Sequence, residues 1–296
     1  MKSFCGFFWL FVILCSYMSA KAINVDEILT KSRQFKLITS FSYINLARKD
    51  SYLGSIGAQL PDGTHITLPY VGAQSTNQDH LNFSLYMRYG IYRRVEVFST
   101  INAFWQHSGV NDTISSRYIA SSRGDFGLWN LGVLIQAKKE GKYPALLLGG
   151  SVDLLEQMYF TTTHKTLEYA KGYSFFATSF FTIDPVVFLL QANFRLNLKK
   201  ESQGLSLDSG ESFILNPMVY FAVNPYVSLN AGIKYQYRSS DNVNGTTLAP
   251  LGSSLGYTIG IGYEIKPKLI LFASADFLPT SQYTSNSLSL MLSYRI

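Results

Sequence analysis

Few residues of this chain could perform catalysis, and the histidines are the first to consider. Four occur, all in or beside long polar segments: His65, His80, His107 and His164. A serine hydrolase needs a serine hydroxyl within hydrogen-bond reach of a histidine. His107 and Ser108 are the one suggestive pair of neighbours, but adjacent residues of a strand point to opposite faces. Since GxSxG and HExxH motifs are also missing, the sequence predicts that the protein is not an enzyme.

Metal and cofactor sites are not indicated either. The acids and amides of the polar segments do not follow the spacing of an EF-hand: Asp50, Asp62, Asp79, Asn111, Asp112 and Asp241. Cys5 and Cys15 both fall in a segment that we expect to be removed, which excludes disulfides and cysteine-based metal sites. The formal net charge of +6 is small and scattered. We therefore expect no metal, no cofactor and no nucleic-acid partner.

Charged residues at alternating strand positions are the remaining candidates for a site. On the strand assignment below, they share a side with the small polar residues: Lys36, Arg88, Arg94, Glu96, Asp153, Arg195, Lys234, Arg238, Glu264, Asp276 and Arg295. In a closed barrel these charges would line the lumen. They would either pair and hold a narrow barrel shut or form the wall of a channel for small solutes. Arg94 and Glu96 could pair with each other or across a strand.

The elements that would position these charges are twelve segments of strand-like composition. They span 34–47, 80–92, 94–107, 125–138, 144–156, 172–183, 186–199, 211–223, 225–238, 252–265, 268–279 and 286–296. Each is long enough for the ~9–11 tilted residues that cross a bilayer, whereas no apolar stretch after residue 20 reaches the ~18 residues of a spanning helix. Charged residues make up 15% of the chain and aromatic residues another 15%. This balance and an even strand number are typical of membrane barrels.

The connections between these segments alternate between short and long. The short ones centre on 92–93, 139–143, 184–185, 224–225 and 266–267, and three of them place a proline directly after a polar residue, as tight turns favour. The long ones cover 48–79, 108–124, 157–171, 200–210, 239–251 and 280–285. Outer-membrane barrels have short periplasmic turns and longer outer loops. An even number of strands then places both termini in the periplasm.

The last segment shows the clearest alternation. Its apolar face carries Leu288, Leu290, Leu292, Tyr294 and Ile296, while serines and Arg295 occupy the other face with Met291. Period two over this length indicates a strand. We expect the apolar face to meet lipid and the strand to pair with the first one, near 35–43, which closes the ring.

The N-terminus resembles a secretory signal peptide. Lys2 precedes the apolar run 4–15, and Ser19 and Ala20 provide small residues at a cleavage site. Cleavage after Ala20 or Ala22 fits equally well. The sequence therefore predicts three parts: a signal peptide over 1–20, a short periplasmic leader over 21–33, and a barrel over 34–296.

Three stretches resemble the outer-membrane transporter-like family named for the meta-pathway of phenol degradation. They are 124–155, which opens with Gly124-Asp125; 171–197, whose turn at Asp184-Pro185 is the most specific match; and 216–237. The resemblance implies a porin-like barrel of about twelve strands that passes small, often hydrophobic or aromatic molecules.

We therefore predict an all-β chain: a single antiparallel transmembrane barrel of about twelve strands in the outer membrane of a Gram-negative bacterium. The predicted function is a channel or transporter for small solutes. Its partners would be outer-membrane lipid, lipopolysaccharide, the barrel-assembly machinery and the solute. A non-conducting surface or structural protein with partner-binding loops is the alternative, and a lipid hydrolase at the barrel rim is less favoured.

Overall fold

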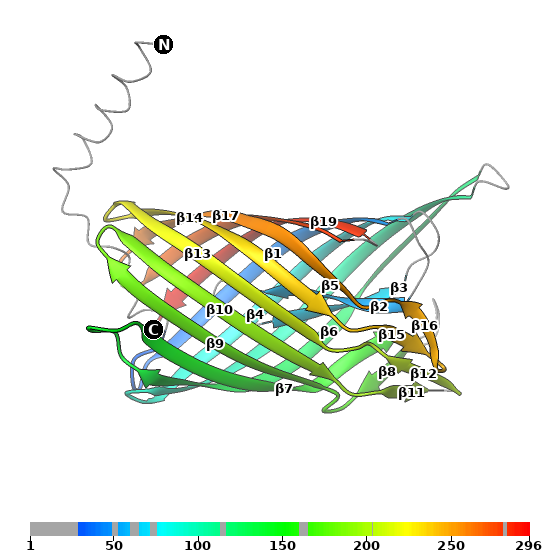
Figure 1. Ribbon diagram of the computed structural model, residues 1–296, viewed down its shortest axis with the longest axis horizontal. Helices are drawn as coiled ribbons and strands as arrows, with labels where there is room; N and C mark the ends of the chain where they lie inside the picture. Colours follow the sequence, from blue (N-terminus) through cyan, green and yellow to red (C-terminus); the bar gives the residue numbers. More distant parts are fainter. Residues whose placement is uncertain are drawn as a thin grey trace, which may run out of the picture.

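The computed structural model describes residues 29–48, 53–59, 65–71, 76–112, 117–159, 165–202, 204–280 and 283–296. All twelve predicted segments form strands in it (Figure 1). They are β1 (Phe35–Arg48), β4 (Thr76–Tyr92), β5 (Val95–Asp112), β6 (Arg117–Lys138), β7 (Ala145–Tyr159), β9 (Gly172–Ile183), β10 (Val186–Asn197), β13 (Ser212–Asn224), β14 (Val227–Arg238), β17 (Gly252–Lys266), β18 (Leu269–Pro279) and β19 (Tyr283–Arg295). The predicted fold class is confirmed.

These twelve strands form one closed antiparallel ring. The order is β6-β5-β4-β1-β19-β18-β17-β14-β13-β10-β9-β7, and β6 also pairs with β7. The last strand pairs with the first as predicted, with Phe41 opposite Leu290. Closure leaves no barrel strand with an unpaired edge, which a protein in lipid requires because no water is present there to satisfy the backbone.

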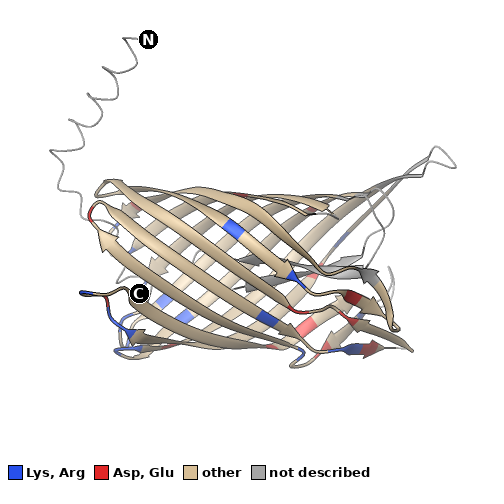
Figure 2. Ribbon diagram, in the orientation of Figure 1, with Lys and Arg blue, Asp and Glu red and all other residues tan. Residues whose placement is uncertain are grey.

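Alternation assigns each strand one outer and one inner face. In β19, Leu288, Leu290 and Leu292 are 55%, 47% and 38% exposed, whereas Met291 and Ser293 between them are buried. The barrel wall between its two ends carries few charged positions (Figure 2). An apolar exterior around a closed barrel is typical of a transmembrane protein, so the leucine face of the last strand is the lipid-facing one.

The two ends of the barrel differ. Short turns and the C-terminus lie at one end, at the left of Figure 1, and the long connections lie at the other. The long connections contain further short strands: β2 (Leu53–Gln59), β3 (His65–Val71), β8 (Lys165–Glu168), β11 (Lys200–Ser202), β12 (Leu205–Asp208), β15 (Asp241–Val243) and β16 (Thr246–Ala249). Strands let these segments satisfy their backbone hydrogen bonds.

The loop strands form two small sheets. Strands β11, β12, β15 and β16 make a four-stranded sheet, and β2 pairs with β3. Strand β3 contacts β6 and β7, although its hairpin leaves from β1 and returns to β4. The β2–β3 hairpin therefore crosses the loop end of the barrel.

Side chains fill much of the interior. One apolar cluster gathers inward-facing residues of the strands near the short turns: Phe98, Leu134, Ala145, Leu147, Phe176, Phe180, Val187, Leu189 and Met218. A second lies on the other side of the barrel: Ile38, Ile44, Leu46, Tyr86, Phe104, Tyr283 and Met291. No helix within the described ranges is long and apolar enough to span a membrane.

Candidate functional site

Ion pairs occupy the barrel interior. Arg88 pairs with Glu96, and Arg195 Nη2 lies 2.5 Å from Asp153 Oδ2. Two further pairs join Lys200 Nζ to Glu156 Oε2 at 2.8 Å and Lys234 Nζ to Asp276 Oδ2 at 3.3 Å. All but Asp276 of these eight side chains are at most 8% exposed. Partners of opposite charge are what buried charges require.

The predicted lumen-lining residues fall into two groups. Arg88, Glu96, Asp153 and Arg195 are sealed from solvent by their neighbours. Lys36, Arg238, Glu264, Asp276 and Arg295 are inward-facing and half-buried, and Lys234 is buried against Asp276. Solvent can therefore reach the half-buried residues, but not Lys234 or the four residues of the first group.

Arg94 lies outside both groups. It is exposed in the two-residue turn between β4 and β5, which occupies 93–94. Glu96 is the first inward-facing residue after that turn, and it pairs with Arg88 of the neighbouring strand instead. The suggested Arg94–Glu96 contact is not formed among these residues, because the turn carries Arg94 out of the strand.

The part of the interior that solvent reaches runs along β17, β18 and β19. Six inward-facing positions there are small and half-exposed: Ser254, Gly260, Ser274, Ser285, Ser287 and Ser289. We call these six residues the serine strip. Asp276 lies within it and accepts hydrogen bonds from Thr258 and from Ser287 Oγ at 3.4 Å. Short side chains leave more of the lumen open beside this strip than long ones would.

A small cavity adjoins the strip beside the Lys234–Asp276 pair. Its volume is about 30 Å³, and Phe272, Tyr220 and Met218 contribute apolar walls. Two amide oxygens on its lining, Asn216 Oδ1 and Asn230 Oδ1, have no protein partner. A cavity of this size holds about one water molecule, so a larger solute would have to displace side chains.

The N-terminal segment 29–34 closes the interior at the short-turn end. Leu29 packs against the apolar cluster there, and the buried Thr30 donates its backbone N–H to Glu96 Oε2 at 2.5 Å. Arg33 N–H also donates to the Gly90 carbonyl at 2.7 Å. A Cβ on Gly90 would lie 2.2 Å from the Lys31 carbonyl oxygen. The absent side chain of Gly90 therefore makes room for this segment inside the barrel.

Next to this segment, three cations lie side by side on the inner wall. Lys36 of β1 is opposite Arg295 of β19 on one side and Arg88 of β4 on the other. All three point inward, and Arg88 is held by Glu96.

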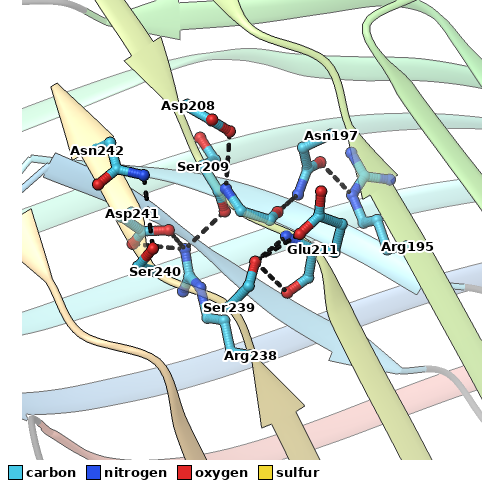
Figure 3. A network of polar contacts seen from close by, with 11 residues as sticks. Arg195, Asn197, Asp208, Ser209, Glu211, Arg238, Ser239, Ser240, Asp241 and Asn242 are labelled. Carbon is cyan, nitrogen blue, oxygen red and sulfur yellow. Dashed lines mark hydrogen bonds and ion pairs between the residues drawn. The ribbon is translucent and has the colours of Figure 1, made fainter. Parts of the chain in front are cut away.

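A buried polar network ties the loop sheet to the barrel at the opposite end (Figure 3). Arg195 Nε donates to Asn197 Oδ1 at 3.0 Å, and Asn197 Nδ2 donates to the Gly210 carbonyl at 2.6 Å. Arg238 Nη2 donates to both carboxylate oxygens of Asp241 at 2.8 Å. At the rim, the exposed Lys199–Glu201 hydrogen bond raises the pKa of Lys199 and lowers the pKa of Glu201.

Three members of these ion pairs were missed from the sequence: Glu156, Lys200 and Asp241. Asp153 and Glu156 are both buried although they are three residues apart, because irregularities in the β6–β7 pairing break the alternation. Lys200 and Asp241 lie in segments that were expected to be loops. The signal available in the sequence was that residues of opposite charge, which could pair, lie near the ends of strands. No group of metal-ligating side chains gathers in the described part of the chain.

Comparison with known protein families found no match, and neither did comparison with curated proteins. Solved structures do resemble this chain. An outer membrane channel from Pseudomonas putida F1 aligns with a TM-score of 0.61 at 10% identity, over 88% of this chain and 95% of that one. The translocator domain of the autotransporter NalP from Neisseria meningitidis aligns with 0.53 at 10% identity, over 100% and 98%. The transport unit of the autotransporter AIDA-I from Escherichia coli aligns with 0.51 at 9% identity, over 95% of each. At such identities the likeness shows the fold, which is a closed antiparallel barrel of the outer-membrane type.

Proposed function

We propose that this protein is an outer-membrane channel for small solutes, and that the solute path follows the serine strip of β17–β19. The observation that carries the proposal is the uneven accessibility of the interior. The predicted charges of β4, β5, β7 and β10 are buried in pairs, whereas the inward face of β17–β19 carries the half-exposed serines and glycine of the strip. A path that crosses a barrel must follow the wall that solvent can reach. The channel neighbour from Pseudomonas putida F1 supports this role.

The same geometry favours a small solute with an apolar part. The cavity at the Lys234–Asp276 pair has aromatic walls from Phe272 and Tyr220 and amide oxygens from Asn216 and Asn230. A hydroxyl or amine of a passing solute could donate to an amide oxygen. Its apolar part would contact Phe272 or Tyr220 only after side chains move, because the cavity holds about one water molecule. The resemblance to the meta-pathway family is consistent with such a solute and is part of the proposal.

The proposal includes the location and the processing of the chain. Residues 1–28 lie outside the described residues, so the signal peptide and its cleavage after Ala20 or Ala22 stay predictions. We place both termini in the periplasm, since the C-terminus lies at the short-turn end. Lipid and lipopolysaccharide would then contact the apolar exterior, and the barrel-assembly machinery would insert the strands.

Conductance in planar bilayers tests this function. Asp276→Asn leaves Lys234 in the path without its counter-charge and is expected to shift ion preference toward anions. Lys234→Gln leaves Asp276 and is expected to shift preference toward cations. Arg94→Gln, at the exposed turn, serves as the control and should leave the ion preference unchanged. Opposite shifts from the two variants support the path, and identical selectivity in all four proteins contradicts it.

A non-conducting barrel is the second candidate, because the ends of the interior are tightly packed. Four ion pairs, two apolar clusters and the segment 29–34 occupy the lumen. Absence of any conductance from the native protein, with the barrel shown to be folded, would favour this alternative.

A further inference from the structure

A row of polar side chains crosses the outer face of the barrel toward the loop end. Asn45 of β1 is opposite Asp79 of β4, Asp79 is opposite His107 of β5, and His107 is opposite Ser122 of β6. Within this row, His107 Nδ1 lies 2.7 Å from Ser122 Oγ. The histidine that has no useful neighbour in the sequence thus meets a serine across the strand pair.

An acidic residue, Asp79, lies on the side of His107 away from Ser122. Opposite residues of antiparallel strands have Cβ atoms roughly 4.5–5.5 Å apart, so the Asp79 carboxylate lies beside the His107 ring. Asp79 Oδ1 accepts hydrogen bonds from Tyr43 Oη at 2.5 Å and from Asn45 Nδ2 at 2.8 Å. These two donors hold the carboxylate in place.

The depth of this row matches that of lipid ester groups. One step closer to the middle of the barrel, the next row of outward-facing residues consists of Tyr43, Leu81 and Trp105. Trp105 stacks on His107, with ring centroids 6.0 Å apart and an interplanar angle of 11°. Aromatic side chains of membrane barrels lie at the boundary between headgroups and acyl chains. The polar row lies one step closer to the loop end than these aromatic residues and therefore faces the region where acyl chains are esterified.

The surface around Ser122 is open. Its neighbours on the same face of β6 are Ala120 and Gly124, and Gly109 is opposite Ala120 on β5. Ser122 itself is exposed. Small residues on both sides leave room for a carbonyl group to approach the hydroxyl. Asn77 is the next outward-facing residue of β4 toward the loop end, and it carries an amide donor on the same face as Asp79.

We propose that Ser122 and His107 form an esterase site on the lipid-facing surface, with an acyl ester of a membrane phospholipid as substrate. Ser122 Oγ attacks the ester carbonyl carbon, and its proton passes to His107. The tetrahedral intermediate collapses, the ester C–O bond breaks, and the leaving alcohol takes the proton from the imidazolium. Water then attacks the acyl-serine through the same base, releases the fatty acid and restores the serine hydroxyl. Asp79 is a positioning residue that stabilises the imidazolium.

The test uses the full mature protein in vesicles that contain phosphatidylethanolamine with a fluorescent acyl chain. We expect release of the fatty acid and covalent labelling by a fluorophosphonate probe. Ser122→Ala should abolish labelling and reduce release by about 100-fold or more, and His107→Gln should reduce release by about 100-fold. Ser121→Ala is the matched control, because Ser121 is the adjacent residue on the opposite face and is also exposed.

Each outcome decides the proposal. Loss of labelling and release in Ser122→Ala, with both retained in Ser121→Ala, supports the site. No release by the native protein above that of empty vesicles overturns it, as does equal release by the native protein and Ser122→Ala. Heat-modifiable migration in detergent gels confirms that each variant is folded. Conductance is measured on the same samples, so that failure of the esterase is separated from failure of the channel.

Discussion

Removal of one partner from the buried Asp153–Arg195 pair should destabilise the barrel strongly. Both side chains are at most 2% exposed, and their closest atoms are 2.5 Å apart. Arg195 has further hydrogen bonds to Asn197 at 3.0 Å and to Ser174 at 3.4 Å. Asp153→Asn would leave the buried guanidinium without its ion-pair partner. We expect a loss of about 3–5 kcal/mol in the free energy of unfolding.

Glycine at position 172 provides an independent measure of the same contact. A Cβ at Gly172 would lie 2.1 Å from Asp153 Oδ2 and 2.5 Å from Arg195 Nη2. Gly172→Ala must therefore push the pair apart and should lose part of the same free energy. The double variant Asp153→Leu with Arg195→Met removes both charges and should be more stable than either single charge removal.

Urea titration of the protein in lipid vesicles, followed by tryptophan fluorescence, measures these differences. The exposed Lys165–Asp125 pair, with side chains 57% and 24% exposed, is the control. Lys165→Gln should change the free energy of unfolding by about 0–1 kcal/mol. The reasoning is refuted if Asp153→Asn loses less than about 1 kcal/mol, or if the double variant is less stable than both single variants.

Three further predictions concern the ring, its lipid face and its short-turn end. Phe41→Cys with Leu290→Cys should form a disulfide that links the first and last strands, because these residues are direct partners; absence of the cross-link on reducing and non-reducing gels would contradict the register. Leu290→Lys should cost about 2–4 kcal/mol in urea titration if it lies near the middle of the bilayer, whereas Ser289→Lys, on the serine strip, should cost much less. Gly90→Val should displace the segment 29–34 and raise single-channel conductance above that of the native protein; an unchanged conductance would show that this segment does not limit flow.

The wall of the barrel could be predicted in detail from the sequence. Each strand meets lipid on one face, so its apolar residues recur at every second position, and this pattern is local. The boundaries of 172–183 agree with β9 to the residue. The outward leucines of β19 and its pairing with β1 were also predicted correctly.

The partners inside the barrel could not be predicted in the same way. The turn at 93–94 sets the register of β4 against β5. This register brings Arg88 to Glu96, and the turn itself places Arg94 at the surface. Glu156 turns inward because irregular pairing shifts the phase of β7. Register depends on turn length and bulges, and a shift of one residue exchanges the faces of a strand.

The side-chain contacts on the outer face could not be predicted from the sequence either. The sequence places His107 next to Ser108, on the opposite face, and gives no sign of Ser122. Only the pairing of β5 with β6 brings the ring of His107 to the Ser122 hydroxyl, and only the pairing of β4 with β5 adds Asp79. The sequence by itself therefore determined which residues face lipid, because burial against a solvent is a property of each strand alone. The tertiary structure decided which side chains meet, because that depends on how distant strands are aligned.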